Sequence, residues 1–495
     1  MENSVSVLRL AAPVRRKIAV STAFRISVAQ SLRTLSRAAA KVDRATIAHA
    51  LLLAAISQSE GDVGGAIRIL ERALAKSGDG DRDYVVEVLG PLYVSTDKLV
   101  KLMELLRTRA YLPALALSRE TLLCVLGARQ DRAGVPAELQ RRVADEEDDL
   151  LRARWQQRLA MAAYYCDDFE AASELALTSV QGYTLAGSGR GLAAAYSLLY
   201  AINYVATGDI ELALRYASLQ ERHARRCGNE SLAVAALVAR YELSAELGDR
   251  EAVSALRRKV RERPLPEQYR ERFAKSIADV LWLLWSGDFV AACGSLARLR
   301  TGADRALEEQ ALCSALLALA QAALSDLSAA RRSSRRALAA IPDQRMSAGQ
   351  RADSRRYLTL ARALAAAACL LIDDSVRGRR VFDTRSLWND SSFRCLEDVA
   401  DGTDWLTASE RTRGFARAVA TVRDVVRAQQ FPPLTSAERL ILTLIADGKS
   451  APDIAKDLGR SPNTVRAHTR SIIAKLNVSG RLAAVAEARR LGVVS

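Results

Sequence analysis

A pair of residues that ends one helix and opens the next recurs along this chain at nearly constant spacing. The pairs are Gly61-Asp62, Asp167-Asp168, Gly208-Asp209, Gly248-Asp249, Gly287-Asp288 and Ser325-Asp326. From residue 167 onward they begin 41, 40, 39 and 38 residues apart. Glycine ends a helix in the left-handed conformation, and aspartate caps the free N–H groups of the next helix. Such a period predicts a stacked array of helices.

The sequence between these pairs is rich in alanine, which lets paired helices approach closely, and only 5% of the 495 residues are aromatic. This composition favours helices over sheets. The pattern of small and apolar positions resembles tetratricopeptide repeats in the longer form found in bacterial regulators. We therefore expect an all-α chain with a tetratricopeptide-like solenoid over residues 47–372. An irregular all-α domain with evenly spaced loops is the alternative.

The segments that flank this array are less regular. Residues 1–46 are basic and lack the apolar stretch of a secretory signal, so we expect an amphipathic helix or a disordered arm and assign no role. Residues 373–430 predict a loop-rich cap and a connecting helix from 409 to 430. The Phe431-Pro432-Pro433 sequence ends that helix and predicts a linker, because proline lacks the backbone donor that a helix needs.

Residues 431–495 predict four short helices. Thr435 with Glu438 forms a capping box for the first, Ser450 caps the second, and Ser461 caps the third, which has Pro462 at its first position. Gly448 and Gly459 end the first two. The apolar stripe of the first helix is expected at Leu440, Ile441, Leu444 and Ile445.

The third helix has two unlike faces. Val465, Thr469, Ile472 and Leu476 fall on one stripe, and Asn463, Arg466, Ala467, Arg470 and Ala474 lie opposite. Arginines on successive turns can reach guanine edges or phosphates, and the alanines allow a close approach to the groove floor. This face predicts a helix laid into the major groove of DNA.

Flanking residues extend the expected interface. Ser461 and Thr464 suit a phosphate at the helix start, and Lys475 and Arg481 lie where flanking phosphates would be met. The candidate DNA-binding residues are Ser461, Asn463, Thr464, Arg466, Ala467, Arg470, Lys475 and Arg481. In the fourth helix, Leu482, Val485, Ala486 and Leu491 are expected at a self-paired interface, with ordinary core packing as the alternative.

Several short motifs occur together in residues 431–495. They are L-T-x-x-E at 434–438, I-A-x-x-L at 454–458, S-x-x-T-V-R at 461–466, His468, K-L-x-V at 475–478 and Arg481. They closely resemble the LuxR-type helix-turn-helix over about an eighth of the chain. The resemblance implies that the third helix enters the major groove, that the fourth mediates dimerisation, and that Arg466, Ala467 and Arg470 meet bases. Ala437, Pro452 and Arg460 depart from the usual pattern. His468 is interpreted as a packing residue or a phosphate contact.

The charge is compatible with a nucleic-acid partner. The chain carries +15, of which residues 431–495 supply +5 from ten Lys/Arg and five Asp/Glu. The densest basic run elsewhere lies between Arg331 and Arg356. It is interpreted as a solvated face, with a second DNA or anion contact as the alternative.

Other classes of protein have little support. The seven cysteines form no C-x-x-C pair and none neighbours one of the three histidines, so no metal, cofactor or catalytic group is expected, and we predict that the protein is not an enzyme. A phosphate-binding G-x-x-x-x-G-K-[ST] motif is missing, and Gly187 to Gly191 is interpreted as a loop. The scattered, odd number of cysteines favours a reduced cytoplasmic protein with buried thiols. No apolar run reaches about 18 residues, so no membrane contact is expected.

These patterns predict a bacterial sequence-specific transcriptional regulator without an ATPase or receiver domain. Its helical array would bind a peptide, protein or small-molecule effector, and a homodimer would bind an operator with two-fold symmetry. RNA polymerase is a further candidate partner. The alternative is an interaction scaffold whose C-terminal module has lost DNA binding.

Overall fold

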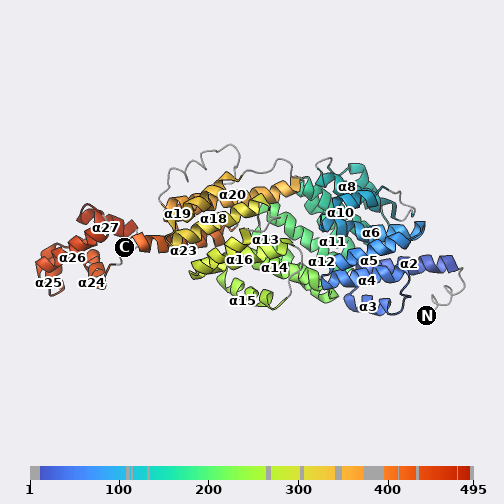
Figure 1. The fold of residues 1–495 in the computed structure, drawn as a ribbon, viewed down its shortest axis with the longest axis horizontal. Helices are drawn as coiled ribbons and strands as arrows, with labels where there is room; N and C mark the ends of the chain where they lie inside the picture. The colour runs from blue at the N-terminus through green and yellow to red at the C-terminus, as the bar shows by residue number, and fades with distance from the viewer. Residues whose placement is uncertain are drawn as a thin grey trace. The chain divides into compact units, whose positions relative to one another are not determined.

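The computed structural model describes residues 12–107, 112, 115–130, 134–263, 269–300, 306–340, 348–372, 395–410, 412–430, 434–476 and 478–490. Within these ranges the regular secondary structure is entirely helical, which confirms the all-α expectation (Figure 1). None of the helices in these ranges is both long enough and apolar enough to cross a bilayer. Two compact units are present, Met1–Asp279 with Ile341–Tyr357, and Val280–Ala340 with Leu358–Ser495.

The helices of the first unit are given first, together with α16 and α20, each of which begins in the first unit and ends in the second. They are α2 (Ala12–Ala29), α3 (Leu32–Ala39), α4 (Ile47–Glu60), α5 (Val63–Lys76), α6 (Asp79–Ser95), α7 (Leu99–Leu105), α8 (Ala116–Arg129), α9 (Ala137–Ala144), α10 (Asp149–Tyr165), α11 (Phe169–Leu185), α12 (Gly189–Ile202), the π-helical turn η2 (Asn203–Thr207), α13 (Ile210–Cys227), α14 (Glu230–Glu246), α15 (Arg250–Arg261), α16 (Tyr269–Ser286) and α20 (Ala348–Leu371). The second unit adds α17 (Phe289–Arg300), α18 (Leu307–Ala323), α19 (Leu327–Ala339), α22 (Cys395–Asp401), the 3₁₀ turn η4 (Trp405–Thr407), α23 (Arg413–Gln430), α24 (Ser436–Ala446), α25 (Ala451–Asp457), α26 (Pro462–Lys475) and α27 (Arg481–Arg490).

The six recurring residue pairs all form the expected helix–turn–helix junctions. The four glycines take left-handed φ values of 97°, 65°, 72° and 78°, and Asp167 and Ser325 take the same conformation at 59°. At every junction the following aspartate opens the next helix, accepting a hydrogen bond from the N–H three residues on. Local backbone chemistry therefore sets where these helices begin and end.

Two further junctions lie between these pairs. Gly187 and Gly228 have left-handed φ values of 64° and 72°, and Ser188 and Asn229 cap the helices that follow. The interpretation of residues 187–191 as a loop is therefore wrong for Gly189–Gly191, which form the first turn of α12, whereas Gly187 and Ser188 do lie in the turn before it. Gly191 is needed for packing: a Cβ there would lie 2.2 Å from the Tyr183 ring.

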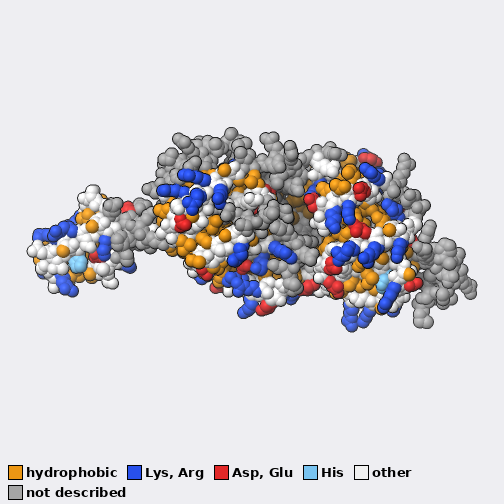
Figure 2. Space-filling view, in the orientation of Figure 1, with side chains coloured by type: hydrophobic (Ala, Val, Ile, Leu, Met, Phe, Trp, Pro, Cys, Tyr) orange, Lys and Arg blue, Asp and Glu red, His pale blue; other side chains and the backbone are white. Residues whose placement is uncertain are grey.

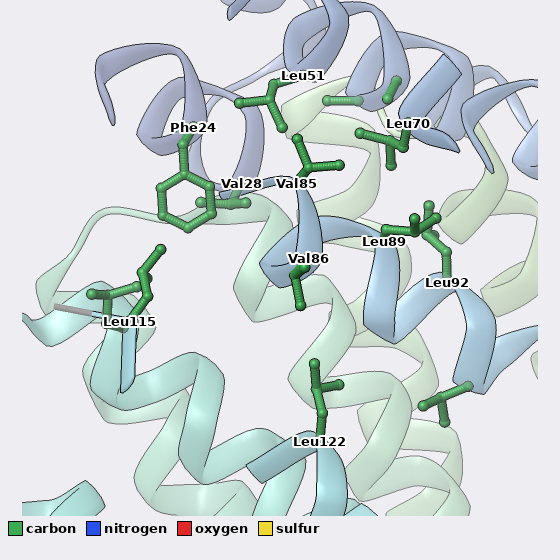
Figure 3. Close-up of a cluster of buried hydrophobic side chains, with 14 of the residues drawn as sticks. Phe24, Val28, Leu51, Leu70, Val85, Val86, Leu89, Leu92, Leu115 and Leu122 are labelled. Atoms are coloured by element: carbon green, nitrogen blue, oxygen red, sulfur yellow. The ribbon is translucent and has the colours of Figure 1, made fainter. Parts of the chain in front are cut away.

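The N-terminal helices belong to the core of the first unit. Val20, Phe24 and Val28 of α2 are buried and share one cluster with Leu51 of α4 and Val85 of α6 (Figure 3). The predicted boundary at residue 46 therefore does not match the packing. Helices that precede and that follow this position in the sequence both pack against α2. Residues 1–11 lie outside the described ranges.

Consecutive helices pack in pairs through alanine. Ala153 and Ala160 of α10 and Ala172 and Ala176 of α11 are fully buried between neighbours. At Gly182 of α11 a Cβ would lie 2.9 Å from the Cβ of Ala153, so only glycine allows this approach. Such pairing is compatible with tetratricopeptide-like repeats, which remain a prediction for residues 47–372.

The segment before the C-terminal module differs in two ways from expectation. α22 occupies part of the predicted loop-rich cap, and residues 373–394 lie outside the described ranges. α23 begins at Arg413 instead of 409, because the Ser409 and Thr412 hydroxyls hydrogen-bond each other before the helix starts. Trp285 Nε1 donates to the carbonyl of Gly414 at 2.9 Å and fixes the start of α23.

Candidate nucleic-acid interface

Residues 434–490 build their own small hydrophobic core. It joins buried side chains of α24, α25, α26 and α27, among them Ile441, Leu442, Ile445, Ile454, Val465, Ile472, Leu476, Ala484, Val485 and Ala488. The expected apolar stripe of α24 is wrong at one position: Leu440 is 49% exposed, and Leu442 is fully buried in its place. The inward stripe of α26 is confirmed, since Val465 and Ile472 are buried and Thr469 is half-buried.

The helix caps hold this core in register. Thr435 and Glu438 form the expected capping box, and Ser450 forms a second one with Asp453. Ser461 Oγ accepts from the Thr464 N–H at 3.1 Å, and Pro462 stands in the first turn of α26. Pro452, a departure from the usual motif, lies in the first turn of α25, where no intrahelical hydrogen bond requires its N–H.

Glu438 also ties the first helix to α26, which the sequence did not reveal. Its carboxylate accepts from Ser471 Oγ and from Lys475 Nζ, both at 2.7 Å, and from the Thr435 N–H at 2.7 Å. Burial alone would raise the pKa of this carboxyl, but the hydrogen bonds from Lys475, Ser471 and Thr435 outweigh it and lower the pKa to about 2. The available signal was the spacing of Ser471 and Lys475 on one face of the helix.

The outer face of α26 is open. Asn463, Arg466, Ala467, Arg470 and Ala474 are all exposed, on the side of the helix away from the core. Arg466 Nη1 donates to Asn463 Oδ1 at 3.0 Å, so this pair is ordered along the helix surface. The structure thus brings together the arginines and the small residues between them on one accessible strip.

Three of the candidate arginines line one surface hollow. Arg466, Arg470 and Arg481 border a space of about 450 Å³ with residues of α24, α25 and α26. Arg481 donates to the backbone carbonyl of Lys449, which fixes it beside the α24–α25 turn. Lys and Arg side chains gather on the surface of this domain in the space-filling view (Figure 2).

The remaining candidate residues occupy different environments. Ser461 is exposed and Thr464 half-buried at the start of α26, and His468 is also half-buried. Lys475 contacts Glu438 inside the domain, with its side chain 25% exposed, so its ammonium stabilises the fold whatever else it meets. Its role as a phosphate contact stays a prediction.

The fourth helix divides into a buried and an exposed side. Leu482 is 85% exposed and Ala486 is exposed, whereas Val485 is only 8% exposed and belongs to the core. Core packing, the alternative interpretation, therefore accounts for Val485. Leu491 lies outside the described residues. An interface between copies through this helix would rest on Leu482 and Ala486.

Comparison with known proteins agrees with this geometry. The family model described as "Bacterial regulatory proteins, luxR family" matches residues 432–488. The probable transcriptional regulatory protein NarL of Mycobacterium tuberculosis is 49% identical over 59 residues, 12% of this chain and 27% of that protein. The transcriptional regulatory protein DesR of Bacillus subtilis is 38% identical over 60 residues, or 12% of this chain and 30% of DesR.

A third relative is matched over most of its length. The spore germination protein GerE of Bacillus subtilis is 41% identical over 64 residues, which are 13% of this chain and 86% of GerE. The chain spans less than a third of NarL and of DesR, so the likeness to those proteins concerns the C-terminal module. With four packed helices, an exposed arginine face on the third and these matches, the chain belongs to the LuxR family of bacterial regulatory proteins.

Proposed function

We propose that this chain is a transcriptional regulator that binds specific duplex DNA through α26. The observation that carries the proposal is the strip of Asn463, Arg466, Ala467 and Arg470, exposed on a helix whose opposite face is buried in the domain core. A helix with this pattern fits the major groove, and the guanidinium fork matches the O6 and N7 acceptors of guanine. Family membership supports the proposal.

The phosphate contacts are proposed from the same geometry. Ser461 and Thr464 lie at the N-terminus of α26, and Arg481 lines the same hollow as Arg466 and Arg470. Backbone contacts of this kind position a helix without reading sequence. We assign base contacts to Arg466, Ala467 and Arg470, and phosphate contacts to Ser461, Thr464 and Arg481.

Two copies are proposed to bind an operator with two-fold symmetry. Leu482, a large apolar side chain that is 85% exposed on α27, supports this arrangement, and Ala486 one turn further is exposed as well. The helices of residues 12–372 are proposed to sense an effector and to bias how the C-terminal modules are presented to DNA.

The test begins with fragments of genomic DNA selected by the full-length chain. Dissociation constants for a selected duplex are then measured at fixed salt by fluorescence anisotropy for the wild type, Arg466→Ala and Arg470→Ala. Each substitution is expected to lose about 1–3 kcal/mol of specific binding. Arg489→Ala removes the same charge from an exposed position on α27 and is the matched control. Equal affinity in all four proteins would favour the scaffold with a degenerate module.

A further inference from the structure

The first unit contains a cavity whose charged lining residues are all arginines. The space measures about 260 Å³ and is bordered by α2, α4, α6, α10, α11, α12 and the start of α14. Arg154, Arg158 and Arg190 line it, and none of the described lining residues is an aspartate or a glutamate. Arginines on an ordinary surface are scattered and face solvent, whereas these three line one enclosed space.

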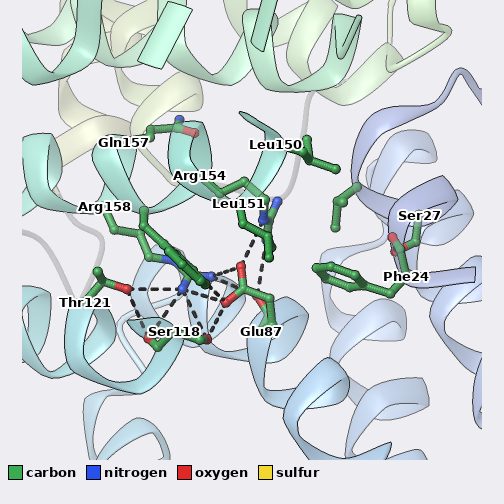
Figure 4. Close-up of polar contacts among 12 residues, drawn as sticks. Phe24, Ser27, Glu87, Ser118, Thr121, Leu150, Leu151, Arg154, Gln157 and Arg158 are labelled. Atoms are coloured by element: carbon green, nitrogen blue, oxygen red, sulfur yellow. Dashed lines mark hydrogen bonds and ion pairs between the residues drawn. The ribbon is translucent and has the colours of Figure 1, made fainter. Parts of the chain in front are cut away.

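Two of these arginines share one buried carboxylate. Glu87 is fully buried, and both its oxygens are engaged: Arg158 Nη2 and Arg154 Nε donate to Oε1 at 2.6 and 2.9 Å, and Arg158 Nη1 donates to Oε2 at 2.7 Å (Figure 4). One negative charge thus faces two guanidinium groups. The region around the cavity keeps an excess of positive charge even before Arg190 is considered.

Arg190 is a buried charge that has no acidic partner among the described residues. Only 7% of the residue is exposed, and its guanidinium donates to neutral oxygens of α4, those of Ser59, Gln58 and the Ala55 backbone. Within the part of the chain that the structure describes, no carboxylate lies within ion-pair distance of this guanidinium. Desolvation lowers the pKa of this group to about 10, so it stays charged at neutral pH. An uncompensated buried charge is costly for folding, which indicates a use beyond stability.

The amide side chains that line the cavity also present donors. Gln157 Oε1 already accepts from the Tyr183 hydroxyl at 2.6 Å, and Asn229 Oδ1 accepts from the Leu232 N–H at 3.1 Å. Neither NH₂ group donates a hydrogen bond to another of the described residues, so both remain able to donate to a ligand. Guanidinium and amide donors facing one space are the complement of a carboxylate or a phosphate.

We propose that this cavity binds a small molecule that carries a carboxylate or phosphate group, with Arg190 as its principal counter-charge. At about 260 Å³ the cavity is slightly smaller than the about 300 Å³ of the smallest common small-molecule sites, so only a compact ligand fits. Leu92, Met161 and Leu232 supply an apolar wall for the rest of the molecule. The inference deepens the sensing role given to the helical array and rests on that proposed function for its consequence, because the ligand would be the effector.

The binding test uses the full-length chain and calorimetry. Sodium phosphate, sodium benzoate and sodium succinate are titrated at constant ionic strength against sodium chloride, which corrects for the general attraction of anions to a basic protein. Saturable one-site binding of phosphate alone would assign a phosphate ligand, and binding of the organic acids a carboxylate. Failure of all three anions to bind more tightly than chloride would overturn the proposal.

Variants locate the site. Arg190→Met is expected to weaken binding at least about tenfold, the effect of losing a hydrogen bond to a charged group. Ser59 Oγ also donates to the Ala55 carbonyl at 2.7 Å, so this variant leaves no buried hydroxyl unpaired, and its melting temperature should match or exceed the wild type. Arg335→Met, at an exposed position of α19, is the charge-matched control and should bind as the wild type does.

A second variant, Gln157→Glu, keeps the proposal testable if Arg190→Met does not fold. Gln157→Glu keeps an acceptor for the Tyr183 hydroxyl but replaces the NH₂ donor with a negative charge, and it is expected to abolish anion binding. Wild-type affinity in either Arg190→Met or Gln157→Glu would contradict the assignment. If the wild-type chain binds DNA but none of the anions, only this inference is refuted, whereas a wild-type chain that binds an anion but no DNA refutes the proposed function.

Discussion

Replacing Glu438 with glutamine tests how the C-terminal module holds α26. Glutamine keeps the size of the side chain but removes the charge that Lys475 and the Ser471 hydroxyl contact. The pKa of Glu438 falls from 4.5 to about 2 in the folded domain, which corresponds to about 3 kcal/mol in favour of the charged carboxylate. We therefore expect Glu438→Gln to lower the free energy of unfolding of this module by about 2–3 kcal/mol, since glutamine retains part of the cap.

The sign of the pH dependence follows from the lowered pKa. Because the folded carboxyl binds its proton less readily than the unfolded one, the stabilisation is complete above about pH 4.5. It is lost as the pH falls toward 2. The difference between wild type and Glu438→Gln should therefore be constant above pH 5 and shrink below it.

Hydrogen exchange in the full-length chain measures this locally. The opening free energies of amides in α24 and α26 are compared between wild type and variant at several pH values. Asp453→Asn is the matched control, because Asp453 is also a capping-box carboxylate but is exposed and lacks a partner on α26 in the described contacts. Its effect should be smaller and confined to α25. Equal protection of α26 in wild type and Glu438→Gln at pH 7 would refute the reasoning.

Three further predictions concern packing in the first unit and self-association of the C-terminal module. Glu87→Gln leaves two guanidinium groups without their carboxylate and should destabilise the first unit by about 3–5 kcal/mol, seen as lost exchange protection in α6 and α10; full protection would contradict this. Gly191→Ala forces a clash and should cost about 1–3 kcal/mol in thermal unfolding, whereas Gly127→Ala, with open space at its Cβ, should not destabilise; equal melting temperatures would count against the packing argument. Leu482→Asp should change stability by less than about 0.5 kcal/mol but weaken self-association on a two-half-site duplex in sedimentation, whereas Val485→Asp should unfold the module; an unchanged dimer in Leu482→Asp would exclude this interface.

The sequence predicted well those features of the fold that depend on a few neighbouring residues. The junctions at Gly208-Asp209 and Gly248-Asp249 depend on one left-handed residue and one capping side chain, both readable within a few positions. The cap at Ser461 and the inward stripe of α26 were predictable for the same reason. The exposed strip with Arg466 and Arg470 follows from that stripe, because a helix that buries one face presents the other.

Contacts between distant segments were not predictable from one sequence. Glu87 accepts hydrogen bonds from Arg154 and Arg158, which lie 67 and 71 residues further along the chain. No local sequence pattern predicts this pairing. Lys475 was expected to contact a phosphate because its charge could be seen in the sequence. Its partner Glu438 lies on another helix, and that contact could not be seen. Gly191 was interpreted as part of a loop, although it lies in the first turn of α12 and must be small because Tyr183 packs on it.

Methylation interference on a selected duplex tests the central claim most directly, namely that α26 reads bases in the major groove. Guanine N7 faces the major groove and adenine N3 the minor groove, so one dimethyl sulfate experiment distinguishes the two. We predict that N7 methylation of specific guanines blocks the full-length wild-type chain, and that interference at one of them disappears in Arg470→Ala. Interference confined to adenine N3, or the same guanine pattern in wild type and variant, would contradict the account.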